Sequence, residues 1–213
     1  MPQSKSEIAD VNRLQVESET DPFTAERYSQ FHSHLPAGAT KILDVGCGTG
    51  RGGEVLKLRN PSIDLTGLDC LPERVQALDK KVYSNAICAF ASDIPAESNS
   101  YDAIVAGEFI EHVPSAQVDA ILAEFFRVLR LRGRILLTTP NPHYLRNKIQ
   151  KLSVLCVPAH ISQHYPDCLA YRLRMSGFSK IKIFGSGKVS RYLGQRFPMR
   201  SIYGSYLIRG NKW

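Results

Sequence analysis

The chain has 213 residues and a mass of 23.8 kDa, with 43% apolar and 22% charged residues. This composition predicts one globular domain over residues 1–213 and excludes a disordered chain, a collagen-like fibre and a coiled coil. The sequence contains neither an apolar run of the ~18 residues that cross a bilayer nor the apolar core of a signal peptide. Five scattered cysteines without a CxxC pair indicate reduced thiols, so we expect a cytoplasmic protein.

The net charge of +7 is divided unevenly along the chain. Residues 1–126 contain 10 basic and 19 acidic residues, whereas residues 127–213 contain 17 basic residues and a single acid, Asp167. Such asymmetry favours a polyanionic partner, and the alternative is a solvated basic surface without a ligand. We expect a small anionic molecule as the partner, with RNA and peripheral contact with a membrane as alternatives, and a monomer or a homodimer.

The first half of the chain alternates expected helices and strands. Residues 1–20 are polar and form an N-terminal arm that we expect to be flexible or helical. Thr24 is suited to cap a helix over residues 25–34. A buried strand over residues 41–45 then enters a glycine-rich turn at Gly46. The pattern continues with helices over residues 52–58 and 72–79 and with strands over residues 64–69, 86–91 and 101–106.

The second half begins with the clearest helical pattern, apolar residues at three- and four-residue spacing from Val118 to Leu129. A strand over residues 134–139 follows. Residues 141–166 are longer than an ordinary connection, which predicts a mobile lid or substrate-binding insertion. A helix ending near Gly177, strands over residues 180–184 and 203–209, and a basic loop over residues 185–201 complete the chain. The alternation predicts an α/β, Rossmann-like doubly wound sheet.

A glycine-rich loop, Asp44-Val45-Gly46-Cys47-Gly48-Thr49-Gly50, follows the first expected strand. Alternating glycines let the backbone turn sharply and approach a ligand closely. A carboxylate at Asp44 would repel a pyrophosphate but suits a ligand that carries ammonium and sulfonium groups. Asp69 ends the second strand, where an acid can accept hydrogen bonds from ribose hydroxyls, and Asp93 follows the third, beside the expected position of an adenine. Strand-end capping is the alternative for either acid alone, but their shared edge favours a ligand site.

At these residues the sequence resembles the class I S-adenosylmethionine-dependent methyltransferases. The matching segments are Leu43 to Gly50, Asp69, Ser92-Asp93-Ile94-Pro95 and Tyr101-Asp102. The resemblance covers residues 38–140 well and the last two strands more loosely. It implies a seven-stranded sheet with an antiparallel last strand, helices on both faces, and S-adenosyl-L-methionine as the cofactor.

The resemblance also implies the cofactor-binding residues. Gly46 and Gly48 are expected under the methionine moiety, Asp69 on the ribose, and Glu108 beside the methionine end. The full set that it implies is Asp44, Gly46, Cys47, Gly48, Asp69, Cys70, Asp93, Ile94, Glu108 and Phe109. The family's usual Pro-Gly-Gly before the fifth strand reads Leu131-Arg132-Gly133 here, which alters a turn.

The segment Glu108-Phe109-Ile110-Glu111-His112 follows the fourth strand and brings acids and an imidazole to the mouth of the expected site. On one helical turn, Glu108, Glu111 and His112 could hold a divalent cation, with His160 or His164 as a further ligand. The pattern is similar to ubiquinone-pathway O-methyltransferases and to small-RNA 2′-O-methyltransferases that use such a metal. Two alternatives are a general-base role for His112 or His164 and a purely structural role for the segment.

The favoured activity is methyl transfer from S-adenosylmethionine to a hydroxyl group. A hydroxyl must lose its proton, which a histidine or a metal ion can promote, whereas an amine needs only to be neutral. The expected acceptor is a small sugar-, nucleotide- or lipid-linked molecule. The alternatives are an RNA 2′-O-methyltransferase, which the basic half favours, and a non-catalytic S-adenosylmethionine-binding subunit.

Overall fold

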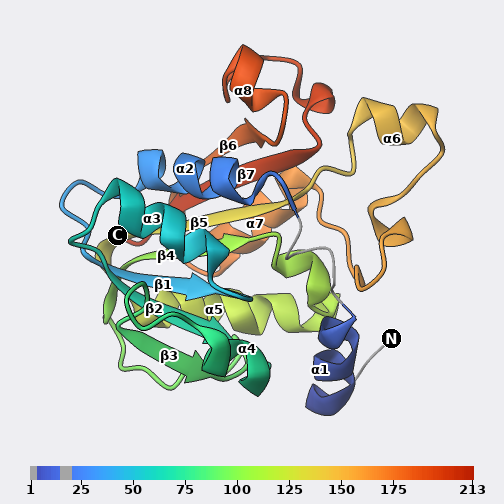
Figure 1. Cartoon of the computed structure of the whole chain (residues 1–213). Helices are drawn as coiled ribbons and strands as arrows, with labels where there is room; N and C mark the ends of the chain where they lie inside the picture. The colour runs from blue at the N-terminus through green and yellow to red at the C-terminus, as the bar shows by residue number, and fades with distance from the viewer. Residues whose placement is uncertain (1–3, 15–20) are drawn as a thin grey trace.

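A seven-stranded sheet forms the centre of the protein in a computed structural model that describes residues 4–14 and 21–213 (Figure 1). The strand order is β3-β2-β1-β4-β5-β7-β6. The strands are β1 (Lys41–Val45), β2 (Asp64–Asp69), β3 (Asn85–Cys88), β4 (Tyr101–Gly107), β5 (Leu129–Pro140), β6 (Ser179–Ser186) and β7 (Ser205–Asn211).

The α-helices of the described chain are α1 (Lys5–Arg13), α2 (Thr24–His34), α3 (Arg51–Arg59), α4 (Pro72–Ala77), α5 (Val118–Val128), α6 (Leu145–Ile149), α7 (Pro166–Met175) and α8 (Ser190–Leu193). Short 3-10 turns are η2 (Ile110–His112), η3 (Ser115–Gln117), η4 (Val154–Cys156) and η5 (Arg200–Ile202). Within these described ranges, no helix has the length and apolar character that crossing a bilayer requires.

The direction of the strands agrees with the expected doubly wound sheet. Strands β1 to β5 pair in parallel, and β7 lies antiparallel between β5 and β6. The prediction of a seven-stranded sheet with an antiparallel last strand is therefore confirmed. Because the parallel strands all end at one edge, the loops that follow them gather there.

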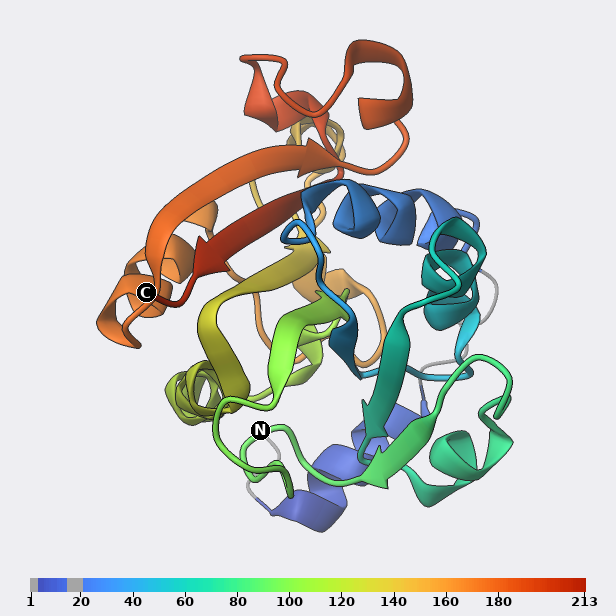
Figure 2. The ribbon, with the colours of Figure 1, turned by 90° about the vertical axis from the view of Figure 1, so that its left-hand side faces the viewer.

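Two apolar cores hold helices against the two faces of the sheet (Figure 2). On one face, Phe31 of α2 and Leu56 of α3 are fully buried. On the other, Phe125 of α5 and Leu173 of α7 are fully buried. The prediction of helices on both faces is confirmed, since each face is apolar and must be covered.

Several boundaries differ from the sequence-based expectation. The expected helix through Leu129 ends at Val128, because Leu129 already pairs with Tyr101 of β4 and begins a longer β5. Thr24 is not the cap of α2 but its first residue, and the Asp21 carboxylate accepts a hydrogen bond from the Phe23 N–H just before it.

The third strand is shorter than expected. It ends at Cys88 rather than residue 91, and the chain leaves the sheet so that Ala89, Phe90 and Ala91 line a cavity. At the C-terminal end, β7 begins at Ser205 and continues to Asn211, two residues later at each end than expected.

The N-terminal arm is helical where the structure describes it. Ser4 and Glu7 form a reciprocal capping box at the start of α1. The remainder of the expected arm, residues 1–3 and 15–20, lies outside the described residues. The expected insertion at 141–166 contains α6 and η4, and its role as a mobile lid stays a prediction.

The glycines at the start of α3 make room for aromatic side chains. A Cβ atom on Gly52 would overlap the Tyr28 ring, and one on Gly53 would overlap the Tyr83 hydroxyl. Both tyrosines reach over α3 to the end of β1, so these glycines let three elements meet without a gap.

We predict that Gly52→Ala lowers the free energy of unfolding by about 1–2 kcal/mol, since overpacking a core costs roughly 1–3 kcal/mol. Without the Tyr28 contact, alanine would stabilise a helix relative to glycine by about 0.5–1 kcal/mol. Urea unfolding monitored by circular dichroism measures the difference. Gly204→Ala is the control, because the nearest atom to its added Cβ would be 3.8 Å away. An unchanged or stabilised Gly52→Ala protein would contradict the packing argument.

Candidate active site

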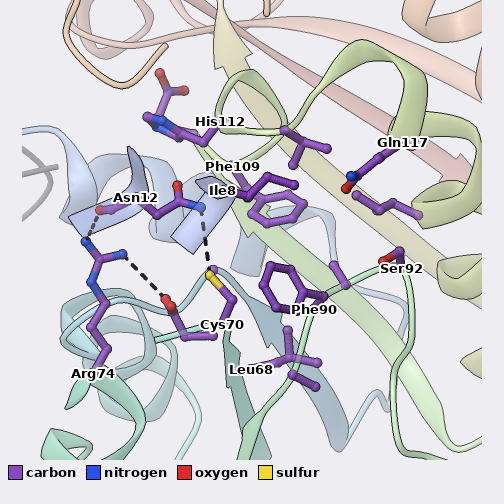
Figure 3. Close-up of a pocket in the computed structure, with 17 residues that line it drawn as sticks. Ile8, Asn12, Leu68, Cys70, Arg74, Phe90, Ser92, Phe109, His112 and Gln117 are labelled. Carbon is purple, nitrogen blue, oxygen red and sulfur yellow. Dashed lines mark hydrogen bonds and ion pairs between the residues drawn. The ribbon is translucent and has the colours of Figure 1, made fainter. Parts of the chain in front are cut away.

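An apolar cavity lies at the carboxyl edge of the sheet, between α1 and the ends of β1, β2 and β4 (Figure 3). Apolar side chains of Leu68, Phe90 and Phe109 form much of its wall. Its lining residues are Ile8, Asn12, Gly46, Leu68, Asp69, Cys70, Arg74, Ala89, Phe90, Ala91, Ser92, Glu108, Phe109, His112, Val113, Gln117 and Ile121. Such a cavity, mainly apolar with a few polar groups, is typical of a binding site for a small molecule.

A second, polar cavity adjoins the first and shares Gly46, Arg74 and Glu108 with it. Its remaining lining residues are Asp21, Thr24, Arg27, Tyr28, Cys47, Gly48, Thr49, Arg51, Gly52 and Gly107. The glycine-rich loop therefore separates an apolar compartment from one that contains both acids and arginines. This division suits a ligand with an aromatic, apolar end and a zwitterionic end.

All three glycines of the loop have a backbone that favours glycine, and Gly50 has φ of 88°. Gly46 and Gly48 have φ of 66° and 55°, in the left-handed region. A Cβ atom on Gly46 would also lie 2.7 Å from Cδ2 of Phe109. Phe109 thus packs directly on the loop, and its expected place beside the cofactor stays a prediction.

Asp69 lies at the boundary between the cavities and organises the turn around it. One carboxylate oxygen accepts a hydrogen bond from the Gly48 N–H at 3.1 Å, and the other accepts one from the Leu71 N–H at 3.0 Å. Arg74 lies 3.7 Å from the same carboxylate and donates to the Asn12 carbonyl of α1 at 3.0 Å (Figure 3). Asp69 retains acceptor capacity toward the cavity, because each carboxylate oxygen has two lone pairs.

The structure does not bring Asp93 into the cavity. Its side chain is 82% exposed and lies 3.7 Å from the Lys5 ammonium of α1. Ile94 is buried, and its N–H donates to Glu124. The cavity is instead lined at this point by Phe90 and Ser92, so the expected adenine contacts of Asp93 and Ile94 stay a prediction.

Asp44 is buried beneath the loop and lines neither cavity. Its two carboxylate oxygens accept hydrogen bonds from the Tyr28 and Tyr83 hydroxyls, each at 2.7 Å. The expected direct contact of Asp44 with a ligand does not fit this geometry, because the tyrosines cover both oxygens. Burial is the main cause that raises the pKa of Asp44 to about 7, and the two hydroxyl hydrogen bonds oppose it.

The expected cysteines lie in separate compartments. Cys47 lines the polar cavity, and burial raises the pKa of its thiol well above the usual range. Cys70 lines the apolar cavity, where burial raises its pKa to about 11. Both are therefore neutral thiols near pH 7, suited to packing rather than to nucleophilic attack.

Glu108 faces both cavities. It has φ of 50°, and its carboxylate lies 3.5 Å from Arg27 Nε and accepts from the Ser205 hydroxyl at 3.3 Å. The oxygen that faces Arg27 is Oε1, which is buried and accepts no hydrogen bond from the described residues. A buried acceptor of this kind beside a polar cavity suits a cationic ligand group.

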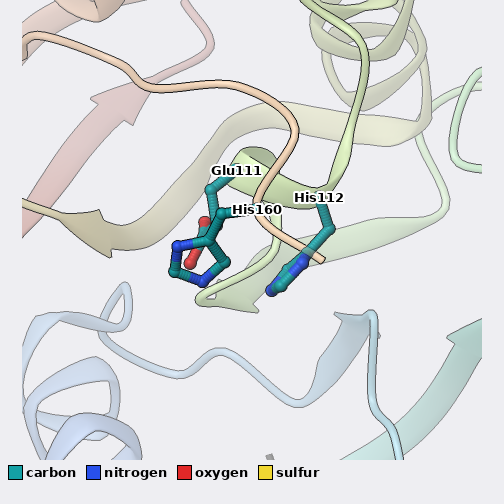
Figure 4. A group of neighbouring side chains, drawn as sticks. All are labelled: Glu111, His112 and His160. Carbon is teal, nitrogen blue, oxygen red and sulfur yellow. The ribbon is translucent and has the colours of Figure 1, made fainter. Parts of the chain in front are cut away.

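Glu111, His112 and His160 come together at one side of the apolar cavity (Figure 4). One possible ligand atom from each residue lies within 4.8 Å of the others, and the centroids of the two imidazole rings are 4.9 Å apart. The Nδ1 atoms of the histidines bond to the carbonyls of Ala159 and Val154, each at 2.9 Å. Those contacts leave Nε2 of each ring for another ligand.

The charges of this cluster follow from its burial. Glu111 is fully buried, and burial together with the neighbouring Glu108 raises its pKa well above the usual range. Its Oε2 accepts from the Thr139 hydroxyl at 2.9 Å, whereas its Oε1 has no hydrogen-bond partner in the part of the chain that the structure describes. Burial lowers the pKa of His112 to about 4, so its imidazole is neutral near pH 7.

The second half of the 141–166 insertion packs against the turn that carries Glu111. The N–H groups of Ile161 and Ser162 donate to the Glu111 carbonyl at 3.0 and 3.1 Å. The imidazole of His164 is instead within hydrogen-bond distance of the Ser162 hydroxyl and the Ile110 carbonyl. His164 is buried and lines neither cavity, so its position suits packing rather than the expected catalytic role.

The sequence-based set contains Glu108 as a metal ligand, but the cluster does not include it. The segment forms a 3-10 turn over residues 110–112, and Glu108 precedes that turn and points to Arg27. The sequence did not indicate the roles of Tyr28, Tyr83 and Arg74, or that the N-terminal helix lines the cavity. No local pattern indicates these contacts, since Tyr83 bonds to Asp44, 39 residues away, and Arg74 bonds to the Asn12 carbonyl, 62 residues away.

Comparison with known proteins agrees with this fold. Residues 42–133 match a family described as a methyltransferase domain. The structure superposes on a SAM-dependent methyltransferase from Archaeoglobus fulgidus with a TM-score of 0.70 at 20% identity, covering 88% of this chain and 92% of the other. Residues 42–133 therefore resemble a methyltransferase domain, and the chain has the fold of S-adenosylmethionine-dependent methyltransferases.

Two relatives are named as O-methyltransferases. A malonyl-acyl-carrier-protein O-methyltransferase from Laribacter hongkongensis is 30% identical over 142 residues, which are 61% of this chain and 46% of the relative. A mitochondrial ubiquinone biosynthesis O-methyltransferase from Mus musculus is 29% identical over 120 residues, or 52% of this chain and 31% of the relative. The chain thus spans less than half the length of these relatives.

We predict that Asp44 makes the stability of the fold depend on pH. The folded carboxyl holds its proton up to a pKa of about 7, whereas the unfolded one loses it near 3.8. Folding therefore takes up a proton between these values, and the free energy of unfolding falls as the pH rises through this window.

Comparison with Asp44→Asn isolates the effect. Between pH 5 and 6.5, the stability of the natural protein relative to the variant should fall by about 1.4 kcal/mol per pH unit and then level off above pH 7. Urea unfolding of both proteins at each pH measures this difference. Parallel stability profiles from pH 5 to 8 would contradict the raised pKa.

Proposed function

We propose that this protein transfers a methyl group from S-adenosylmethionine to a hydroxyl of a small, anionic, sugar-, nucleotide- or lipid-linked acceptor. The observation that carries the proposal is the pair of adjoining cavities at the glycine-rich loop, with Glu111, His112 and His160 beside them. The names of the two relatives as O-methyltransferases support transfer to oxygen.

The chain's own residues fit the two ends of the cofactor. The apolar cavity suits an adenine between Phe90 and Leu68, with Asp69 placed to accept hydrogen bonds from ribose hydroxyls. In the polar cavity, Arg27 and Arg51 suit a carboxylate. Glu108 Oε1 lies 3.5 Å from Arg27 Nε, accepts no hydrogen bond from the described residues, and suits an ammonium group. S-adenosylmethionine, when bound, supplies a methyl group on a positively charged sulfur.

The reaction needs an acceptor held in line with that methyl group and relieved of its proton. Holding two reactants in line supplies much of the rate of a displacement. His112 lines the apolar cavity, and its neutral imidazole can take a proton from a hydroxyl. Its Nδ1 contact with the Ala159 carbonyl fixes the ring and leaves Nε2 as the accepting atom.

A divalent cation also fits the cluster. The buried Glu111 Oε1 lacks a partner, and His112 and His160 each have a nitrogen free of hydrogen bonds within the described residues. Two imidazoles and a carboxylate are a common ligand set for divalent transition metals. A cation held there would lower the pKa of a hydroxyl bound to it.

We predict that Asp69→Ala weakens S-adenosylmethionine binding by ~10- to 100-fold, because it removes two acceptor sites for ribose hydroxyls at about 0.5–1.5 kcal/mol each or more. Isothermal titration calorimetry measures the affinity. Asp64→Ala is the matched control, since Asp64 begins the same strand at the opposite edge of the sheet. Equal affinities in two folded variants would refute the assignment of this cavity to the cofactor.

We also predict that the protein binds one Mn²⁺ ion and that His160→Ala weakens this binding at least ~10-fold, because it removes one of three ligands. Electron paramagnetic resonance of free Mn²⁺ measures the bound fraction. His143→Ala is the control, since His143 is exposed and outside the cluster. If both variants bind Mn²⁺ like the natural protein, the cluster holds no metal and His112 alone remains to accept the proton.

A further inference from the structure

Two surface segments carry most of the exposed large apolar side chains. We call residues 142–158 and 187–202 the rim segments. Of the 16 large apolar residues exposed within the described chain, nine lie in these two segments: Leu145, Ile149, Leu152, Leu155, Val157, Tyr192, Leu193, Phe197 and Met199. Ile149 and Tyr192 are each 73% exposed. Apolar side chains gathered in this way on a surface mark a site of interaction.

The rim segments are also basic. Neither contains an aspartate or glutamate, and together they contain seven cations: Arg146, Lys148, Lys151, Lys188, Arg191, Arg196 and Arg200. All seven side chains belong to exposed residues. Arg191 pairs with Glu26 of α2 at 2.9 Å, and the other six form no salt bridge within the described chain.

The fold brings the rim segments to one edge of the molecule. One follows β5, and the other connects β6 to β7, at the same edge of the sheet. Buried Asn141 joins them, because its side-chain amide donates to the carbonyls of Arg200 and Tyr203, each at 3.0 Å. In Figure 1, α6 and α8 both project from this side of the sheet. The cofactor cavities open at the carboxyl edge as well.

We propose that the rim segments bind the surface of an anionic lipid bilayer. Lysine and arginine side chains attract acidic headgroups, while leucine, isoleucine and aromatic side chains enter the boundary between headgroups and acyl chains. The two kinds of side chain alternate closely, as in Lys148-Ile149 and Met199-Arg200. This binding does not depend on the proposed methyl transfer, but it would place the acceptor side of the cavities at the membrane.

The charge argues against two other occupants. A second copy of the same surface would bring seven cations against seven cations with no acid between them, which is unfavourable. RNA would neutralise the cations but leave exposed aliphatic residues such as Ile149 and Leu152 in water, since stacking on bases needs aromatic groups.

Vesicle sedimentation tests the proposal with the full chain. We expect the protein to bind phosphatidylcholine vesicles containing about 30% phosphatidylglycerol and to bind pure phosphatidylcholine at least ~10-fold more weakly. Binding should fall as salt rises from about 50 mM to about 500 mM, because salt screens the headgroup charge. Equal binding to both kinds of vesicle, or none to either at low salt, would overturn the proposal.

A matched pair of variants tests the location. Lys148→Gln with Ile149→Ser removes one cation and one exposed aliphatic side chain from a rim segment, and should weaken vesicle binding at least ~10-fold. Leu131→Ser with Arg132→Gln removes the same chemistry at the opposite end of β5, where Leu131 is 66% exposed. This control should bind vesicles like the natural protein. A larger loss in the control would overturn the assignment to the rim segments.

Two further measurements separate the other occupants and the proposed function. If the protein fails to bind vesicles but binds polyuridylate tightly, RNA replaces the lipid surface as the occupant. If it fails to bind vesicles but forms a dimer that Lys148→Gln with Ile149→Ser abolishes, a second copy replaces it. Calorimetry with S-adenosylmethionine should give unchanged affinity in the rim variant. If the natural protein does not bind S-adenosylmethionine, the proposed function is refuted, and the vesicle result still decides the lipid proposal.

Discussion

The hydrogen bonds of the buried Asp44 carboxylate hold together the carboxyl edge of the sheet, where the two cavities lie. The two carboxylate oxygens accept hydrogen bonds from Tyr28 of α2 and from Tyr83, which precedes β3. These bonds hold a helix and a loop to the end of β1, directly beneath the glycine-rich turn. Gly52 and Gly53 lie where the tyrosine side chains pass, so α3 packs without displacing them. A buried carboxylate without these donors would carry a large desolvation cost, which makes the two tyrosines as important as the acid.

The cavities follow from this framework. With the loop held down, Gly46 leaves room for Phe109, and Gly48 donates its N–H to Asp69. Asp69 in turn lies near Arg74, and Arg74 donates to α1, so the N-terminal helix closes the apolar cavity through a chain of polar contacts. The apolar cavity is therefore lined both by the N-terminal helix α1 and by residues near the middle of the chain, such as Phe109.

The cluster of Glu111, His112 and His160 depends on a different segment, residues 141–166, which leaves the sheet after β5 and returns to pack against Glu111. Backbone hydrogen bonds tie Ile161 and Ser162 to Glu111, and this contact brings His160 beside His112. The earlier part of the same insertion projects outward with its apolar and basic side chains exposed. One connection thus supplies both His160 of this cluster and an exposed surface of apolar and basic side chains.

The sequence by itself determined the doubly wound sheet, the glycine-rich loop and the place of Asp69, because each depends on local periodicity, backbone freedom and the common edge of parallel strands. It also indicated Glu108, Glu111 and His112, with His160 or His164, as candidates that could meet, and three of these do. Only the tertiary structure decided that Asp44 faces two tyrosines, that Asp93 points to solvent and His164 packs inside, and that α1 covers the cavity. These outcomes depend on contacts between residues far apart in the chain, and a side chain's partner at that range is set by packing, which no local pattern encodes.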